Sequence, residues 1–528
     1  MKALLEPIKE IARFDELFRD LKKGTAGVTV ISGCLESQKA HMIAGLSEDA
    51  PVRLLIAENE LKAKELYEDY RLYDAETLYY PAKDLIFYQA DIHGNLLIRQ
   101  RLQVIQALLE RKEVTIITSV GGCMDFLLPL DVFEKHCIHL RNDSELDLDK
   151  IRKELVRLGY ESTFQVESTG QFSVRGGILD IYPLTEQNPI RIELWGDEID
   201  SIRSFDAESQ RSIENLEEIT IYPASELILT EDTIARGVKA IKKEAKAQST
   251  KFRDKMMTEE AARIRHAAEE ICDQIGEGEI LQGAEQYLHY FYPETVSFLE
   301  YLPENSRIFL DEPNRIIECA DALEAEFQES VSHRLEKGYL LPGQAKLMCS
   351  TAELVAKLNR RGCVAVSLME PQKGEWNIRD EFSVTVKSVN SYNNQFPLLV
   401  KDLKSWKKAG YRIVLASPSR TRAQHLAEDL QNEEIPAFYS ENEERVLKPG
   451  EVMLIHGAAR RGFEYPMQKF VLITETDIFG KEKKKNRKKS EYSGQKIQNF
   501  ADLSIGDYVV HESHRSEEHT SELQSHYV

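Results

Sequence analysis

The stretch ISGCLESQKAHM, residues 31–42, decides how the N-terminal part of the chain folds. The apolar run VTVIS leads into Gly33, four residues follow, and Gln38, Lys39 and Ala40 come next. A strand, a glycine turn and a helix that begins near a lysine form the frame of a phosphate-binding loop, in which glycines, the lysine and a hydroxyl residue hold phosphate and magnesium. This frame predicts a strand-to-helix unit of an α/β domain.

The chemistry of such a loop is largely missing here. Gln38 brings a side chain to a position that needs the backbone freedom of glycine, and Ala40 cannot ligate a metal. Only Gly33 and Lys39 match the motif. Two interpretations stay open: an ordinary strand-to-helix turn in which glycine and lysine coincide by chance, or a relic ATPase domain that folds but does not bind ATP.

A second piece of a nucleotide site is suggested by RIFLDEPNR, in which an apolar strand ends in Asp311 and Glu312. ATPases use acids in this place to hold magnesium and polarise water. Pro313 follows directly, and the damaged loop at Gly33 favours a simpler interpretation, acids that cap the end of a strand. Because no other catalytic constellation stands out, we expect no enzymatic activity in this chain.

Composition limits the functional classes. The chain has 528 residues with 68 Lys and Arg against 89 Asp and Glu, and its net charge of −21 argues against broad non-specific binding to nucleic acid. The seven cysteines form no Cys-x-x-Cys pair, which is typical of a reducing cytoplasm. His136, Cys137 and His139 lie close together in KHCIHL, but without a second ligand pair we expect a strand and no metal site.

Nothing in the sequence predicts a membrane partner. No apolar run reaches the ~18 residues that a spanning helix needs. The N-terminus MKALLEPIKEIARFDELF has the pattern of an amphipathic helix with acids on its polar face and not of a signal peptide. We therefore expect a soluble, cytoplasmic protein.

The order of apolar and charged runs predicts several α/β parts. Runs such as VTVIS, VRLLIA and VTIITS alternate with helical patterns, which is typical of mostly parallel sheets. We expect a first sheet domain over 1–140, an antiparallel β-rich insert over 141–226, a helical return over 227–374 that includes one long charged helical stretch from Glu231 to Gln274, a second small α/β domain over 375–480, a basic linker over 481–500 and the opening strand of a further domain over 501–514.

The insert carries the clearest positive signal, the segment PIRIELWGDEID. Alternation along a strand places Ile190, Ile192 and Leu194 on one face and Arg191, Glu193 and Trp195 on the other. Gly196 and Asp197 have the chemistry of a two-residue hairpin turn. A tryptophan is thus predicted on the polar face beside an arginine, and both residue types are enriched at interface hot spots. Burial of Trp195 by the rest of the insert is the alternative.

These residues resemble a known family. The insert GQFSVRGGILDIYP together with PIRIELWGDEIDSIRSFDAESQRS resembles the UvrA-binding domain shared by the repair protein UvrB and the bacterial transcription-repair coupling factors. UvrB has an intact ATP loop and a tyrosine-rich hairpin that inserts into DNA, whereas no such hairpin follows Tyr79 and Tyr80 here. RRGFEYPMQKFVLITETDIFG and LSIGDYVVHESH are similar to the third domain of the coupling factors and to the start of their RNA polymerase-interacting domain.

The resemblance implies a UvrB-like body with a degenerate nucleotide loop that presents the insert to UvrA. By motif, the contacts with UvrA fall on Arg175, Arg191 and Trp195, where Trp195 replaces the more usual phenylalanine. In the family, ATP and magnesium are used by motor domains that also bind DNA, and the whole protein displaces stalled RNA polymerase. We expect this chain to need no cofactor and to have the recruiting function alone. The rivals are a UvrB-like ATPase that contacts damaged DNA directly and a freestanding adaptor.

The last residues form a separate expectation. RSEEHTSELQS, within 515–528, has no apolar period and resembles the in-frame translation of a common DNA sequencing adapter. The family reads on differently after His514. We therefore expect the natural chain to continue there, with a natural polar tail as the alternative.

Overall fold

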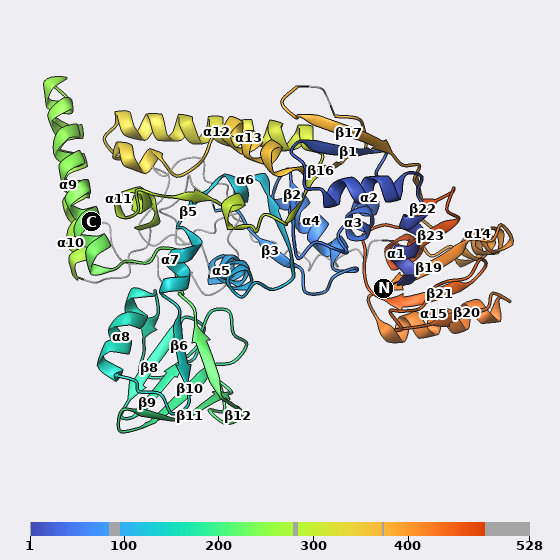
Figure 1. The fold of residues 1–528 in the computed structure, drawn as a ribbon, viewed down its shortest axis with the longest axis horizontal. Helices are drawn as coiled ribbons and strands as arrows, with labels where there is room; N and C mark the ends of the chain where they lie inside the picture. Colours follow the sequence, from blue (N-terminus) through green and yellow to red (C-terminus); the bar gives the residue numbers. More distant parts are fainter. Residues whose placement is uncertain (1, 84–94, 278–283, 372–373, 481–528) are drawn as a thin grey trace, which may run out of the picture. The chain divides into compact units, whose positions relative to one another are not determined.

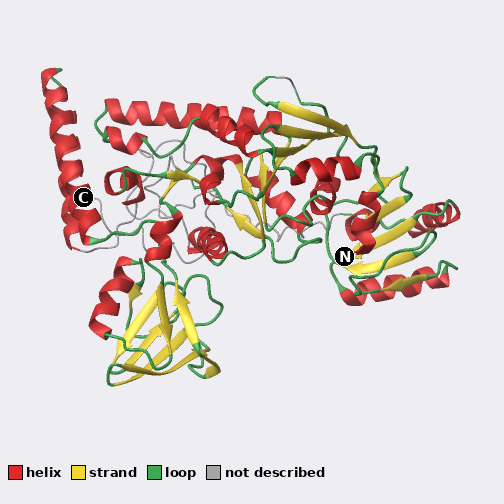
Figure 2. Ribbon diagram, viewed as in Figure 1, coloured by secondary structure: helices red, strands yellow, loops and turns green. Residues whose placement is uncertain are grey.

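The computed structural model describes residues 2–83, 95–277, 284–371 and 374–480, and these belong to one compact unit, Met1–Gly480 (Figure 1). The expectations for 481–514 and 515–528 lie outside the described residues. Three sheets of six or seven strands organise the described chain (Figure 2).

The first sheet has seven strands in the order β17-β1-β16-β15-β2-β4-β3, and every neighbouring pair is parallel. The strands are β1 (Val28–Ser32), β2 (Val52–Ala57), β3 (Leu78–Tyr80), β4 (Val114–Ser119), β15 (Arg307–Asp311), β16 (Cys363–Val366) and β17 (Ile378–Ser383). Its central strands are buried along their whole length, as expected for a parallel sheet covered on both faces. The parallel α/β fold expected from the sequence is confirmed.

Two helices of this domain precede β1, and the others lie between or after the strands. The helices are α1 (Lys2–Lys9), α2 (Phe14–Lys22), α3 (Glu36–Gly45), α4 (Glu60–Tyr70), α5 (Asn95–Leu109), α6 (Val120–Met124), α7 (Leu130–Lys135), α11 (Leu288–Phe291), α12 (Pro313–Glu336) and α13 (Thr351–Arg361). Short strands β5 (Phe126–Leu127) and β14 (Val296–Ser297) pair with each other, and single 3₁₀ turns cover Ala284–Tyr287, Phe298–Tyr301 and Pro342–Ala345.

Two helical expectations are corrected by breaks in the chain. The N-terminal segment forms α1 and α2 rather than one helix, because Arg13 adopts a left-handed conformation with φ 64°. The charged stretch after the insert likewise forms two helices, α9 (Glu231–Asp254) and α10 (Thr258–Glu277), separated at Met256 with φ 62°. The Ser249 hydroxyl donates to the carbonyl of Ala261 across this hairpin.

The insert is a six-stranded sheet in the order β12-β11-β10-β9-β8-β7. Its strands are β7 (Glu161–Ser162), β8 (Gln171–Arg175), β9 (Ile178–Ile181), β10 (Ile190–Trp195), β11 (Glu198–Phe205) and β12 (Ser212–Leu216), and α8 (Leu148–Arg157) precedes them. All pairs are antiparallel except β7 with β8, so the expected antiparallel insert holds for its long strands. A ribbon of β6 (Ile138–Arg141) and β13 (Glu218–Ile221) carries the chain into and out of it.

The last sheet has the order β18-β22-β23-β19-β21-β20. Its strands are β18 (Lys387–Ser388), β19 (Arg412–Ser417), β20 (Ala437–Tyr439), β21 (Val452–His456), β22 (Phe463–Tyr465) and β23 (Phe470–Thr474), with helices α14 (Phe396–Lys408), α15 (Arg420–Asn432) and α16 (Glu475–Phe479). The boundary expected at residue 375 lies too early, because β17 pairs with β1 and completes the first sheet.

Candidate functional site

The turn after β1 has the frame of a phosphate-binding loop, but its backbone N–H groups bond acceptors within the protein. The N–H of Gly33 donates to the carbonyl of Leu368 at 3.1 Å, and the N–H of Cys34 donates to the carbonyl of Ser367 at 3.0 Å. The N–H of Leu35 donates to Oε1 of Gln38 at 3.2 Å. Three amides that could have faced a phosphate are therefore bound inside the protein.

Gly33 has a packing role in this turn. Its φ is 83°, and a Cβ at this position would lie 2.3 Å from the carbonyl oxygen of Val384, just beyond β17. The glycine is required because the chain after β17 approaches so closely, and this reason needs no nucleotide.

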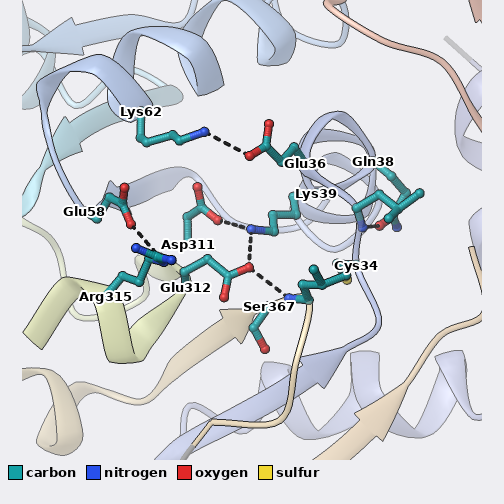
Figure 3. A network of polar contacts seen from close by, with 12 residues as sticks. Cys34, Glu36, Gln38, Lys39, Glu58, Lys62, Asp311, Glu312, Arg315 and Ser367 are labelled. Atoms are coloured by element: carbon teal, nitrogen blue, oxygen red, sulfur yellow. Dashed lines mark hydrogen bonds and ion pairs between the residues drawn. The ribbon is translucent and has the colours of Figure 1, made fainter. Parts of the chain in front are cut away.

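Lys39 is held by the two acids at the end of β15. Its Nζ lies 2.7 Å from Oδ1 of Asp311 and 2.6 Å from Oε1 of Glu312 (Figure 3). Glu312 also accepts the N–H of Leu368 at 2.9 Å, and α12 begins directly afterwards at Pro313, a favoured first helical residue. The structure thus brings together the lysine and both carboxylates that the sequence singled out, and it joins them to each other.

Burial and the neighbouring charges shift the pKa values of Lys39 and Asp311 in opposite directions. Burial opposes ionisation of Lys39, but the attraction of Asp311 and Glu312 outweighs it, so the pKa of Lys39 lies above its ordinary value. Burial raises the pKa of Asp311, and the nearby ammonium partly offsets that rise. Short hydrogen bonds from Lys39 to both carboxylates make these three side chains a largely buried ionic cluster.

The residues do not fit magnesium and ATP in the manner of a phosphate-binding loop. The lysine is already neutralised, the hydroxyl position is the buried Ala40, and the glycine position is Gln38, whose side chain is fully buried. A triphosphate would have to displace the carboxylates from Lys39 and the protein carbonyls from the loop amides.

Gln38 and the helix after it serve a different contact. The Gln38 amide donates to the hydroxyl of Tyr465 on β22 at 2.6 Å, and that hydroxyl lies 3.1 Å from Nδ1 of His41. His41 Nε2 lies 2.7 Å from the carbonyl of Leu4 in α1. Since a carbonyl only accepts, His41 carries its proton on Nε2, and Nδ1 accepts from Tyr465.

A second polar contact joins the same two domains. The guanidinium and the backbone N–H of Arg460 donate to the carboxylate of the buried Asp69 at the end of α4, at 2.9 Å and 2.7 Å. Arg460 also pairs with Glu65 at 2.6 Å. Sequence reasoning missed Asp69, His41 and Tyr465 as contacts between domains, because each is an unremarkable polar or aromatic residue in its own segment.

The outer face of the insert carries the residues expected to bind UvrA. Burial alternates along β10 as expected: Ile190 and Ile192 are buried while Arg191 and Glu193 are half-buried. Trp195 is 84% exposed at the end of the strand, and Gly196 and Asp197 form the two-residue turn, with Trp195 opposite Glu198. A register shift between Glu193 and Leu194 precedes it. The alternative of a buried Trp195 is wrong.

The two arginines converge on one acid. Asp180 on β9 is buried, and it accepts from Arg191 Nε at 2.7 Å, from Arg191 Nη2 at 2.9 Å and from Arg175 Nη2 at 2.9 Å. Hydrogen bonds to Asp180 raise the pKa of Arg191. Arg175 comes from β8 and Arg191 from β10, on either side of β9, so the sheet order itself brings them together.

The residues of KHCIHL make separate contacts, and of His136, Cys137 and His139 only His139 lies in the expected strand, β6. His136 bonds the carbonyl of Val132, Cys137 donates to the carbonyl of Phe133, and His139 lies 3.0 Å from the hydroxyl of Thr220. Within the described ranges, no cluster of three or more possible metal ligands occurs, and no helix is both long and apolar enough to cross a bilayer.

Comparison with known proteins agrees with this geometry. The family model of the UvrB interaction domain matches residues 138–227. The match begins at Ile138, the first residue of β6. The transcription-repair-coupling factor of Bacillus subtilis is 32% identical over 95% of this chain, and that of Staphylococcus aureus strain USA300 is 30% identical over 97% of it. The chain spans 43% of the length of both relatives.

Proposed function

Because the chain is homologous over nearly its whole length to part of the transcription-repair-coupling factors, we propose that it is the portion of such a factor that recruits UvrA in transcription-coupled nucleotide-excision repair. The observation that carries the proposal is the outer face of the insert, with Arg175, Arg191 and an exposed Trp195 inside the region that matches the UvrB interaction domain. Its setting is the bacterial cytoplasm.

The proposal gives the first domain a structural role. Lys39 is bound by Asp311 and Glu312, and α3 is packed against α1 and β22, which supports a scaffold that presents the insert and performs no ATP chemistry. In the complete protein, ATP, magnesium, DNA and RNA polymerase would be handled by parts beyond those described here.

The second candidate function is a UvrB-like ATPase that contacts damaged DNA directly. The observation in its favour is the seven-stranded parallel sheet, in which Asp311 ends the central strand β15 and bonds Lys39 of α3. The closed loop amides and the side chain of Gln38 support recruitment over this alternative.

Binding of the purified chain to purified UvrA, measured by isothermal titration calorimetry, tests the proposal. We expect a saturable one-site isotherm that requires the insert, so that a chain in which residues 142–217 are replaced by a short Gly-Ser linker between β6 and β13 shows none. The control is the melting temperature of the remaining chain. Absence of binding by the intact chain would refute the recruiting function.

A further inference from the structure

We propose that the residues on the outer face of the insert have two different roles. Phe164 and Arg175 contact the partner, whereas Arg191 holds the carboxylate of Asp180, which in turn orients Arg175. This proposal rests on the proposed function and names Phe164 as a contact residue. The chemistry that fits is a carboxylate beside an apolar recess on the surface of UvrA.

Phe164 is an exposed aromatic side chain on a fixed backbone. It is 84% exposed, yet its carbonyl accepts the Ser173 hydroxyl of β8 at 2.8 Å. On one side Thr163 donates its N–H to the carbonyl of Phe172 at 2.9 Å, and on the other side Val166 is buried. A large apolar side chain on a fixed backbone has only its own rotamers to restrict on binding, which favours its use as an interface anchor.

Arg175 lies against Phe164 and retains donors for a ligand. Its guanidinium carbon is 5.7 Å from the centre of the Phe164 ring, within cation–π range. The side chain is 38% exposed, and its bond to Asp180 uses one nitrogen, Nη2. An arginine fork beside an aromatic ring binds a carboxylate and an apolar group together.

Arg191 is engaged by the insert itself. Two of its nitrogens bond Asp180, Nη2 also donates to Gln210 at 3.0 Å, and the guanidinium carbon lies 4.5 Å from the centre of the buried Phe205 ring. Its side chain is 18% exposed. These contacts fix the Asp180 carboxylate, which in turn positions Arg175. Arg191 is therefore a positioning residue that also covers Phe205.

The charges around Arg175 favour an acidic protein side chain as its binding partner. Arg203 on β11 is paired with Glu193, so that pair is neutral, whereas Arg175 and Arg191 share the single carboxylate of Asp180. Among these five groups one positive charge is in excess, and Arg175 is the more exposed of the two arginines that share Asp180. A single cation beside an aromatic ring suits an acidic side chain of a protein, while a nucleic acid strand would require a row of cations.

Calorimetric titration of UvrA against single and double variants tests this division. We expect Phe164→Ala to weaken UvrA binding about tenfold with an unchanged melting temperature. Arg175→Ala should weaken UvrA binding by a similar factor. The double variant should weaken binding by less than the product of the two single factors, because the two residues act together. Met256→Ala, at an 88% exposed residue outside the insert, is the control and should bind as the wild type does.

The positioning role has its own readout. Arg191→Ala should lower the melting temperature as well as the affinity, whereas Arg191→Lys, which keeps one charge for Asp180, should restore part of both. Affinity loss in Arg191→Ala with an unchanged melting temperature would overturn the positioning role.

Failure of this inference is distinguishable from failure of the recruiting function. If the wild-type chain binds UvrA and Trp195→Ala weakens binding, but Phe164→Ala binds like the wild type, only the assignment of Phe164 is overturned. If the wild-type chain does not bind UvrA, the recruiting function fails. Tight binding of a fluorescein-labelled single-stranded oligonucleotide that is lost in Phe164→Ala would show that the occupant is nucleic acid and overturn the proposed chemistry.

Discussion

The side-chain amide of Gln38 donates a 2.6 Å hydrogen bond to the hydroxyl of Tyr465, which lies 427 residues later in the chain. The glutamine stands where a phosphate-binding loop has glycine, and its side chain is fully buried at the contact between the first and last sheets' domains. The residue in the glycine position of the loop therefore supplies a contact between domains. The same hydroxyl donates to Nδ1 of His41, whose Nε2 donates to the carbonyl of Leu4, so a chain of hydrogen bonds runs from Gln38 to Leu4.

Tyr465→Phe tests this chain of bonds. The change leaves the Gln38 amide and His41 Nδ1 buried without their partner, and we expect the free energy of unfolding to fall by about 1–3 kcal/mol. Urea denaturation followed by circular dichroism measures the loss. Tyr439→Phe, whose hydroxyl bonds the exposed Glu441, is the matched control and should change little. Equal effects of the two variants would contradict the role of Tyr465.

Lys39→Met should destabilise the first domain. It leaves Asp311 and Glu312 without their cation, and because Glu312 is partly exposed we take the lower end of the range for a broken buried pair, about 3 kcal/mol. Lys62→Met, which removes the more exposed pairs with Glu36 and Glu65, should lose less than about 1 kcal/mol. The denaturation midpoints of the two variants, each compared with that of the wild type, measure these losses. A stable Lys39→Met variant would show that the buried ion pair contributes nothing net.

Nucleotide binding separates the scaffold from the UvrB-like ATPase. We expect a fluorescent ATP analogue with magnesium to give no saturable signal up to millimolar concentration, because Lys39 and the loop amides already have partners. Micromolar binding that disappears in Lys39→Ala would revive the ATPase interpretation.

The stability of the domain contact should depend on pH through His41. Burial lowers the pKa of His41 to about 4, while the bond to the Leu4 carbonyl acts in the opposite direction. A base with a depressed folded pKa contributes its full stability above the unfolded pKa of about 6.5 and loses it as the pH falls toward 4. We expect this group to lower the free energy of unfolding by about 3 kcal/mol across that window.

The test compares the wild type with His41→Phe by urea denaturation between pH 7 and pH 4. The variant should lose part of the slope in this window, since it cannot take up the proton that the unfolded wild type binds. Parallel curves for the two proteins would mean that His41 does not titrate on unfolding.

Trp195 should report UvrA binding directly. It is 84% exposed, whereas Trp376 is buried and Trp406 half-buried, so contact with a partner should shift its fluorescence emission to shorter wavelength. We expect Trp195→Ala to abolish that shift and to weaken affinity about thirtyfold, or about 2 kcal/mol, with an unchanged melting temperature. Met256→Ala, at a side chain 88% exposed between α9 and α10, is the control. Wild-type affinity of Trp195→Ala would place the interface elsewhere.

Local pattern predicted the strands of the first sheet, the hairpin of the insert and the exposure of Trp195, but it missed the helix breaks at Arg13 and Met256. The alternation in IRIELW and the Gly196-Asp197 turn depend on contacts within a few residues, so they predicted β10, its hairpin and the strand face that half-buried Arg191 shares with exposed Trp195. The parallel first sheet was likewise predictable, because its strands are separated by helical segments that force crossover connections.

Tertiary structure alone decided which of these residues meet. Lys39 reaches Asp311 because β1 and β15 both lie beside β16, an order that no local pattern encodes. Arg175 and Arg191 share Asp180 only because β9 lies between their strands. Gln38 bonds Tyr465 because one domain packs against another, and the loop that carries the exposed Phe164 is bound to β8 at its backbone. Such contacts depend on strand order and domain packing, whereas sequence periodicity specifies a residue's own element and face.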